Sequence, residues 1–373
     1  MSELSYLEKL LDGVEVEWVT LGSMADIGTG SSNRQDESEN GIYPFYVRSK
    51  NILKSDTFEF DEVAIVIPGE GGIGDIFHYV EGKYALHQRA YRIRITTNAV
   101  DTKFLYYFMS SSFKQYILTK SVGATAISIR KPMLEGFKVP IPSPDNPEKS
   151  LAIQSEIVRI LDRFTALTAE LTAELTMRKN QYNYYRDQLL SFDEGEVEWR
   201  TLGEITRKIA SGRNKTRQAE GDFPVYGSTG LLGFTNESAY SGDLLLVARV
   251  GAYAGLVNAV SGHFDVSDNT LIIHPSDSWN ARFAFHQLTH MNLNQYAVGA
   301  GQPLITGGML KNLKVPVPSL NEQTRIAKIL DKFETITVSI TEGLPREIEL
   351  RQKQYEYYRD LLFSFPKPEI ASY

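Results

Sequence analysis

This chain of 373 residues contains no cysteine, which removes disulfide bonds, thiolate zinc sites and a cysteine nucleophile from consideration. No apolar run approaches the roughly 18 residues of a membrane span. The first residues include Glu8, Lys9 and Asp12 among the leucines, so a signal peptide's apolar stretch is lacking. We therefore expect a cytoplasmic protein, and the length predicts two or three domains that each bury a core.

The sequence is repeated internally, with a period of about 175 residues, which is too long for a solenoid and is typical of a duplicated domain pair. Four segments return in the same order: Glu15–Gly22 as Glu196–Gly203, Lys138–Pro142 as Lys314–Pro318, Ile160–Phe164 as Ile329–Phe333, and Tyr184–Asp187 as Tyr357–Asp360. A duplicated protein has two similar working surfaces. Its natural target has two similar halves.

Charge is unevenly distributed, although the net charge of −7 alone argues against a nucleic-acid partner. Residues 82–134 contain nine Lys or Arg and a single acid, Asp101, and residues 205–219 contain five Lys or Arg and no acid. Residues 278–321 contain three basic residues and no acid, whereas acids concentrate in residues 145–198. Locally basic segments of this kind are compatible with a polyanion. The alternative is chance clustering on a solvated face.

Each half of the sequence consists of a β-like part followed by a long helix. Val63–Ile67 and Tyr91–Ile95 are expected strands of the first β-like part, and Leu244–Val247 and Thr270–Ile273 of the second. Proline-rich segments close both parts near Pro142 and Pro318. The predicted boundaries are a first globular domain at 1–145, a helix at 146–194, a second domain at 195–319, a helix at 320–365 and a tail at 366–373.

Apolar residues recur at heptad spacing in both helices. The first seam contains Ile153, Ile157, Ile160, Phe164, Leu167 and Leu171, and resumes at Tyr182, Tyr185 and Leu189 after a four-residue stutter at Leu175. The second contains Ile326, Ile329, Phe333, Ile336 and Ile340, then Ile348, Tyr355, Tyr358 and Leu362, with a kink or break expected at Gly343 and Pro345.

Matching seams within one chain most simply pack on each other. We therefore predict an α+β fold in which two β-rich domains are joined by two long antiparallel coiled-coil helices, with an internal pseudo-twofold repeat. The alternative is that each helix packs on its own β domain.

The sequence lacks the motifs of the common catalytic sites. Gly69–Gly74 matches a dinucleotide-binding glycine pattern, but the next residues alternate like a strand, so we interpret the segment as a hairpin turn. No Walker lysine motif, hydrolase nucleophile elbow or base-holding loop of an amino-methyltransferase is present. His286 and His290 are four residues apart without the glutamate of a zinc helix, which favours a surface or core role. We expect a non-catalytic chain with no cofactor or metal of its own.

The loops of both β-like parts are rich in groups that bind base edges and phosphates, because Arg and Lys suit guanine, Asn and Gln suit adenine, and Ser, Thr and Lys suit phosphate. The candidates in the first domain are Ser31, Ser32, Asn33, Arg34, Arg48, Lys50, His87, Gln88, Arg89, Arg130 and Lys131. Those in the second are Ser211, Arg213, Asn214, Lys215, Arg217, Ser228, Arg249, Asp268, Asn269 and Gln302. Any single one fits a solvated loop residue better than a base contact; only their density on the loops of both copies favours nucleic-acid binding.

The whole chain resembles the specificity subunit of Type I restriction–modification systems, and in particular the type IC-like subgroup. The resemblance rests on Asp145–Ser150, on the tandem Thr-Ala-Glu-Leu repeats, on Gln181–Asp187 and on Gly343–Glu347. These segments lie in the helices and their flanks. The globular domains are similar to the family's target-recognition domains in outline only, through segments such as Ala248–Tyr253 and Ser267–Thr270.

The resemblance implies a sequence-specific subunit that binds double-stranded DNA, with one half of an asymmetric bipartite site for each domain. It implies two modification subunits that use S-adenosylmethionine, and restriction subunits with ATP- and Mg-dependent translocase and nuclease activity. The repeat Thr168, Ala169, Glu170, Leu171, Thr172, Ala173, Glu174 and Leu175 is then a candidate ruler for the gap between half-sites. Tyr182, Tyr184, Tyr185, Tyr355, Tyr357 and Tyr358 exceed what a two-helix seam buries, and are candidate partner contacts or packing residues of their own domains.

Two other classes are distinguished by DNA binding. A coiled-coil adaptor that does not bind DNA would show no salt-dependent association with a duplex. A nucleotide-dependent enzyme would depend on the glycine segment interpreted above as a turn.

Overall fold

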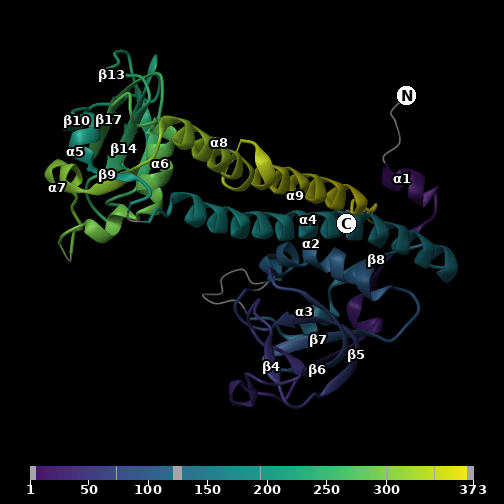
Figure 1. The fold of residues 1–373 in the computed structure, drawn as a ribbon. Coiled ribbons are helices and arrows are strands. Elements are labelled where there is room, and N and C mark those ends of the chain that lie inside the picture. The colour runs from purple at the N-terminus through teal and green to yellow at the C-terminus, as the bar shows by residue number, and fades with distance from the viewer. Residues whose placement is uncertain are drawn as a thin grey trace. The chain divides into compact units, whose positions relative to one another are not determined.

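The computed structural model describes residues 6–72, 74–120, 128–193, 195–299, 301–339 and 341–367. The chain forms two compact units, one of residues 1–170 with 349–373 and the other of residues 171–348 (Figure 1). Each unit therefore contains a globular domain and parts of the long helices. In the described ranges, no helix is long and apolar enough to cross a membrane.

Unit 1 is built on a six-stranded mixed sheet with the strand order β2-β7-β5-β6-β3-β4. The elements of its globular domain are α1 (Tyr6–Leu11), β1 (Val16–Thr20), β2 (Ala25–Thr29), β3 (Tyr43–Tyr46), β4 (Leu53–Ser55), β5 (Phe60–Pro68), β6 (His78–Leu86), β7 (Ala90–Ile95), α2 (Thr102–Lys120), α3 (Lys131–Glu135) and β8 (Lys138–Pro142). A separate antiparallel pair joins β1 to β8, with Trp18 opposite Pro140. Strand β3 runs parallel to β6. The residues that follow these two strands therefore lie close together, although they are far apart in the sequence.

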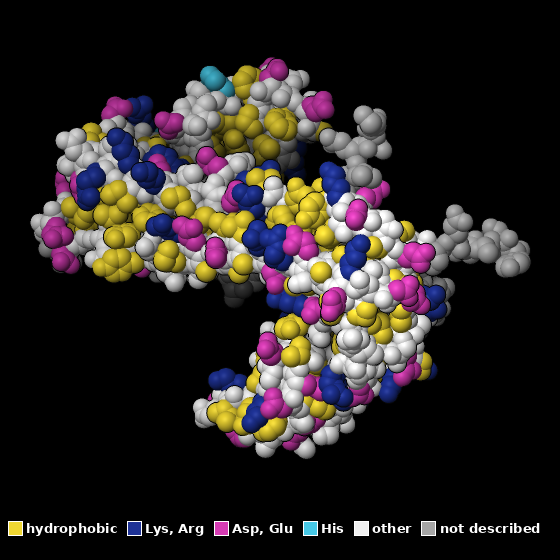
Figure 2. All heavy atoms as spheres, turned by 90° about the vertical axis from the view of Figure 1, so that its right-hand side faces the viewer, with side chains coloured by type: hydrophobic (Ala, Val, Ile, Leu, Met, Phe, Trp, Pro, Cys, Tyr) yellow, Lys and Arg dark blue, Asp and Glu magenta, His cyan; other side chains and the backbone are white. Residues whose placement is uncertain are grey.

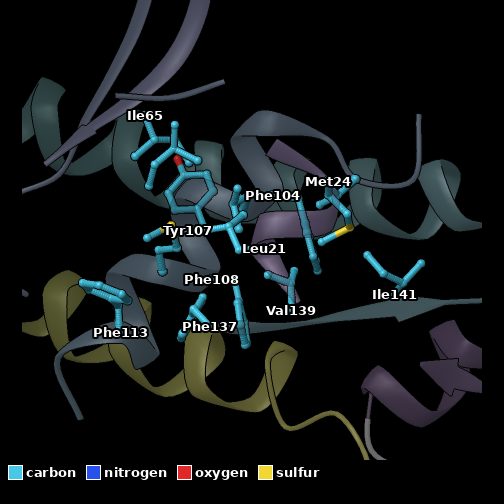
Figure 3. Packing of buried hydrophobic residues seen from close by; sticks show 14 of the residues in the cluster. Leu21, Met24, Ile65, Phe104, Tyr107, Phe108, Phe113, Phe137, Val139 and Ile141 are labelled. Carbon is cyan, nitrogen blue, oxygen red and sulfur yellow. The ribbon is translucent and has the colours of Figure 1, made fainter. Parts of the chain in front are cut away.

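The core of unit 1 lies between the sheet and α2. Ile65 of the sheet is fully buried in one cluster with Phe104 and Phe108 of α2 (Figure 3). Ile93 of the sheet belongs to the same cluster and is also fully buried. The opposite face of β5 and β6 packs a smaller cluster around Tyr84. Burial on both faces explains why the middle of β5 is a continuous apolar run instead of an alternating one.

Unit 2 repeats this plan with shorter elements. Its globular domain contains β9 (Glu198–Thr201), α5 (Leu202–Ile205), β10 (Thr206–Ser211), β11 (Phe223–Gly227), β12 (Gly230–Thr235), β13 (Tyr240–Ser241), β14 (Leu244–Ala248), β15 (Val257–Val260), β16 (His263–Val266), β17 (Thr270–Pro275), α6 (Ala281–His290), α7 (Gly307–Asn312) and β18 (Lys314–Val317). The strands form sheets with the orders β10-β17-β14-β15, β12-β11-β16-β13 and β18-β9. Again α6 covers one sheet, and a second cluster around Phe264 fills the other face.

The long helices are α4 (Pro147–Leu190), α8 (Leu320–Thr337) and α9 (Gly343–Leu362). In unit 1, the first half of α4 packs against the last half of α9, where the rings of Phe164 and Tyr358 stack at 5.4 Å. In unit 2, the end of α4 packs against α8, where Tyr185 and Phe333 stack at 5.7 Å. The second helix is broken between α8 and α9, as Gly343 and Pro345 predict; Ile340 of the expected seam lies outside the described residues.

The long helices also pack on the globular domains, which is the alternative posed by the sequence, although the ends of α4 and α9 join the core of the other half's domain. Leu161 and Leu330 lie off the predicted seams, yet both are fully buried in the domain cores. Leu167, a predicted seam residue, is 37% exposed. The predicted seams therefore do not include Leu161 and Leu330, because the globular domains cover a second face of each helix.

A repeated hydrogen-bond clamp fixes each helix to its domain. The side chain of Gln154 accepts from the Asp101 amide (2.8 Å) and donates to the Ala99 carbonyl (2.9 Å). Gln323 accepts from the Asn280 amide (2.8 Å) and donates to the Ser278 carbonyl (3.0 Å) in the same way. Both glutamines are fully enclosed, so the pairing also satisfies polar atoms that would otherwise be buried alone.

Candidate nucleic-acid interface

Four loops of unit 1, which follow β2, β3, β5 and β6, are joined by backbone hydrogen bonds. We refer to residues 31–34, 47–50, 69–72 and 87–89 as loop cluster 1. The segments after β2 and β6 are joined by a parallel bridge between Ser32 and His87. The segment after β3 joins them through the His87 amide, which donates to the Tyr46 carbonyl (2.9 Å). The segment after β5 is held by the Gly69 amide, which donates to the Arg89 carbonyl (2.9 Å).

Loop cluster 1 depends on a glycine, Gly30, directly after the end of β2. A Cβ atom at Gly30 would lie 1.9 Å from the carbonyl oxygen of Leu86, so no other residue allows this close approach. In unit 2, Gly212 has the same place, with a Cβ position 2.2 Å from the carbonyl oxygen of Ser267. The same backbone crossing therefore supports both sets of loops.

Arg48, Glu70 and Arg89 form an ion triad in loop cluster 1. The Oε2 atom of Glu70 lies 3.0 Å from Arg48 and 3.2 Å from Arg89. The hydrogen bond from Arg89, reinforced by Arg48, holds the pKa of Glu70 below its usual range. Arg48 and Glu70 line an open hollow of about 370 Å³, together with Arg34 and His87.

His87 contacts the backbone of Arg89, one of the three residues of the triad. Its ring is buried beside Phe45, and its Nδ1 atom accepts a hydrogen bond from the Arg89 amide (3.0 Å). Burial, with Arg48 and Arg89 nearby, lowers the pKa of His87. The neutral ring therefore acts as an acceptor that positions the backbone of Arg89.

The other candidates of the first domain have defined local partners. The hydroxyl groups of Ser31 and Ser32 donate to Glu59, at 2.9 and 2.5 Å. Gln88 donates to the side chain of Asn33, which also caps a short helical turn. The remaining candidates, Arg34, Lys50, Arg130 and Lys131, are exposed; Arg34 pairs with Glu37 and Lys131 with Glu135.

Loop cluster 2 (residues 211–217, 227–229, 249–253 and 267–269) is the counterpart in unit 2. The Arg213 and Asn214 amides both donate to the Val266 carbonyl, at 3.0 and 2.9 Å. The Ser267 amide donates to the Tyr226 carbonyl (2.9 Å), as His87 does to Tyr46. The Arg249 amide donates to the Asn269 carbonyl (3.0 Å), which also accepts from the Ser228 hydroxyl (3.0 Å).

Several side chains of loop cluster 2 remain available to a ligand. Arg213, Lys215 and Arg217 are exposed, as is Gln302 in the loop that pairs with Val250 through Leu304. The Nε atom of Arg249 is buried, and no described residue accepts its hydrogen bond. Asp268 accepts from Ser267 (3.4 Å), and Asn214 donates to Asp265 (2.6 Å), so these two side chains are partly engaged.

Sequence reasoning missed two residues of these clusters. In the sequence, Glu70 belongs to a glycine run, and Tyr253, which is 62% exposed in the structure, belongs to a segment that resembles the family. The bridges Glu70–Ser128 and Val250–Leu304 bring the two loops into register in the structure. The sequence alone carries no signal for this pairing.

One cluster of side chains in unit 2 has the composition of a metal site but forms salt bridges between two helices. His286, Asp331 and Glu334 offer ligand atoms within 4.8 Å of one another. The guanidinium of Arg282 already lies between the carboxylates, 2.7 Å from Asp331 and 2.6 Å from Glu334. Because a fixed cation balances both charges, the cluster is a salt-bridged joint between α6 and α8.

The six tyrosines near the helix ends divide into two kinds. Tyr182 and Tyr355 are half-buried, each beneath an arginine at 5.7 or 5.8 Å. Tyr185 and Tyr358 stack on Phe333 and Phe164 yet stay 45% and 42% exposed. Tyr184 and Tyr357 project furthest, at 61% and 65% exposure.

Basic and acidic side chains are interspersed with apolar ones on the face shown in Figure 2.

Comparison with known proteins gives a consistent result over the full length. A family model described as the Type I restriction modification DNA specificity domain matches residues 13–177 and again 194–350. The EcoR124I/EcoR124II specificity subunit of Escherichia coli is 39% identical, with 100% of both chains covered. The EcoprrI specificity subunit of the same species is 40% identical over 92% of this chain and 93% of its own.

The fold is also similar to that of a solved structure. The S subunit of a Type I restriction–modification system from M. genitalium matches with a TM-score of 0.65, covering 96% of this chain and 98% of its own, at 20% sequence identity. At that identity the likeness concerns the fold alone.

Proposed function

This chain belongs to the Type I restriction modification DNA specificity domain family, and we propose that it is the DNA-recognition subunit of a Type I restriction–modification complex. Each globular domain contacts one half of an asymmetric, bipartite site in double-stranded DNA through its loop cluster. The chain itself is non-catalytic. S-adenosylmethionine, ATP and Mg are assigned to the partner subunits.

The observation that carries this proposal is one backbone scaffold with two different sets of side chains. Both loop clusters rest on a glycine crossing, at Gly30 and Gly212, and on matching hydrogen bonds from His87 and Ser267. The side chains above this scaffold differ between the copies. A protein that reads two unlike sequences with one fold needs this combination, because base edges are distinguished by side chains and not by the backbone.

The helices then act as a spacer and as a platform for partners. We assign residues 146–194 and 320–365 to this role, and residues 1–145 and 195–319 to the two target-recognition domains. The helices form an antiparallel coiled coil, and its length sets the gap between half-sites. Equivalent surfaces at Tyr184 and Tyr357 suit two copies of one modification subunit, because a duplicated chain presents the same patch twice.

Two measurements test the proposal. The chain is co-expressed with its modification subunit, and binding to duplex DNA is measured at two salt concentrations. We expect salt-dependent, sequence-specific binding. The methylated positions of the host genome then define the site. Replacing residues 18–142 with the equivalent domain of a relative should change one half-site and leave the other intact.

The competing function, a coiled-coil adaptor without DNA binding, predicts no association with the duplex at either salt concentration. A change of both half-sites after exchange of one domain would contradict the assignment of one half-site to each domain.

A further inference from the structure

The Arg48–Glu70–Arg89 triad is present in only one of two otherwise matched loop clusters. Its three side chains are between 44% and 56% exposed. Both arginines contact Oε2 of Glu70, and Oε1 receives no hydrogen bond from the described part of the chain. Each guanidinium uses a single donor on Glu70 and retains others for a ligand.

The equivalent positions in unit 2 follow from backbone pairing. Arg89 corresponds to Asn269, because their carbonyls accept from Gly69 and Arg249 in the same way. Glu70 corresponds to Val250, through matching bridges to the segment before α3 or α7. Arg48 corresponds to Ser228, since each stands two residues after a tyrosine that pairs with the β6 or β16 strand.

All three charges are therefore missing together from loop cluster 2, whereas the backbone beneath them is the same. The backbone that the two copies share therefore does not require the triad. Three side chains that differ together between two DNA-recognition domains of the same fold are candidates for reading the DNA sequence.

We propose that the Arg48–Glu70–Arg89 triad reads a G·C base pair in the first half of the DNA site. The inference rests on the proposed function and assigns the chemistry of one reading position. Guanine presents two acceptors in the major groove, N7 and O6, which suit an arginine. Cytosine presents the N4 amino donor, which suits the free Oε1 atom of Glu70.

The backbone of Arg89 is held in place before DNA arrives. The Arg89 amide is bound to the buried ring of His87, and the Arg89 carbonyl to the Gly69 amide. Because Arg89 and Arg48 keep Glu70 ionised, its carboxylate can only accept hydrogen bonds. The carboxylate would therefore repel the O4 acceptor of a thymine that replaced the cytosine. The net charge of the triad is positive, which suits approach to a polyanion.

The test uses the assembled complex with its modification subunits and a panel of duplexes that differ from the methylated site by one base pair. Arg89→Ala and Glu70→Gln are compared with the unaltered protein and with Lys50→Ala. Lys50 is an exposed cation two residues from Arg48. We expect Arg89→Ala to reduce discrimination at one G·C pair of the first half-site by roughly 5- to 150-fold. Glu70→Gln should reduce it at the same pair. Lys50→Ala should weaken binding to all duplexes alike.

Discrimination at the second half-site reports whether each variant complex is folded, because the same molecule reads both halves. A first half-site without a G·C pair would overturn the inference. So would unchanged discrimination in both variants, or equal loss in both half-sites. If the unaltered complex shows no sequence-specific binding, the proposed function itself fails, and this result is distinct from a silent triad in a complex that reads DNA.

Discussion

Asp162 and Asp331 occupy equivalent positions in the two units, and each carboxylate ties a long helix to the domain helix beside it. Asp162 accepts hydrogen bonds from the Tyr107 hydroxyl (2.6 Å) and the Lys103 ammonium group (2.8 Å). Asp331 lies 2.6 Å from Nε2 of His286 and 2.7 Å from Arg282. The acceptor is the same, but only the joint of unit 2 contains a histidine.

We predict that acidification destabilises unit 2 through His286. Burial holds the pKa of His286 below its ordinary value, although Asp331 and Glu334 raise it and Arg282 lowers it further. The folded state thus favours the neutral ring, whose contribution is complete above the unfolded pKa of about 6.5 and is lost as pH falls below it. The buried Nδ1 atom, which has no acceptor among the described residues, would have to take up the proton.

Thermal unfolding at pH 7.5 and pH 5.5 measures this effect. His286→Tyr introduces the residue type that contacts the equivalent aspartate of unit 1, where Tyr107 donates to Asp162. We expect this variant to reduce the pH dependence of the unit 2 unfolding transition. His263→Tyr, at an exposed position of the same unit, is the matched control. An identical pH dependence in the His286→Tyr variant would show that another group is responsible.

Alanine at Gly30 should displace loop cluster 1. The new methyl group would overlap the Leu86 carbonyl, and we expect a loss of about 1–3 kcal/mol in the free energy of unfolding together with a loss of specificity at the first half-site. Gly28→Ala is the control, because its nearest neighbour is an arginine side chain at 3.9 Å. Unfolding measurements and mapping of methylated adenines distinguish the variants. Equal behaviour of both would refute the role of the crossing.

Arg213, Lys215 and Arg217 should contribute phosphate contacts in the second half-site. Each contact that is lost lowers the slope of log affinity against log salt by about one, so the triple alanine variant should lose about three. Binding titrations across a range of salt concentrations measure the slope. A variant with alanine at the exposed Lys328 and Lys332 of α8 removes two positive charges outside loop cluster 2 and controls for a general effect of charge. A slope that the triple replacement leaves unchanged would remove these residues from the interface.

A third Thr-Ala-Glu-Leu repeat should lengthen the unspecified gap by one base pair. Residues Thr168–Leu175 lie inside the continuous helix α4. Four more residues add about 6 Å, which is at most about two base pairs at roughly 3.4 Å each. Helix tilt reduces this, and the family resemblance implies one.

The presented face of α4 rotates by only about 40° in this variant. Insertion of a single alanine after Leu175 rotates it by about 100° instead, and we expect that control to abolish recognition. Methylome mapping decides the outcome. An unchanged gap, or an altered half-site sequence, would reject the ruler.

Local patterns predicted four of the strands and the two long helices, but not α2 or α6, which lie inside the parts interpreted as β-like. Val63–Ile67 lies within β5 and Leu244–Val247 within β14, because long β-branched or leucine runs between turns form buried strands. The interruption at Gly343 was predictable as well. Its φ is 81°, and a Cβ atom at this position would lie 2.2 Å from the Thr335 carbonyl oxygen, so both the conformation and the space require glycine.

Long-range pairing was not available from the same patterns. The parallel pairing of β3 with β6 brings Arg48 to Arg89, and neither residue's neighbours in the sequence indicate that contact. Helix periodicity likewise did not reveal Leu161, because the periodic signal reports one seam while two surfaces cover the helix. Composition identified the loops that carry polar groups, and topology decided which of those loops meet.

The docking of residues 349–367 within unit 1 has a consequence for synthesis on the ribosome. Leu362 and Phe365 belong to the core of the first domain, and the Trp18 indole donates to the Pro366 carbonyl (2.8 Å). Domains generally fold in the order in which they emerge. Here the domain that emerges first completes its core last, after the second domain has left the exit tunnel. A premature stop codon near the 3′ end of the gene would therefore damage the N-terminal domain.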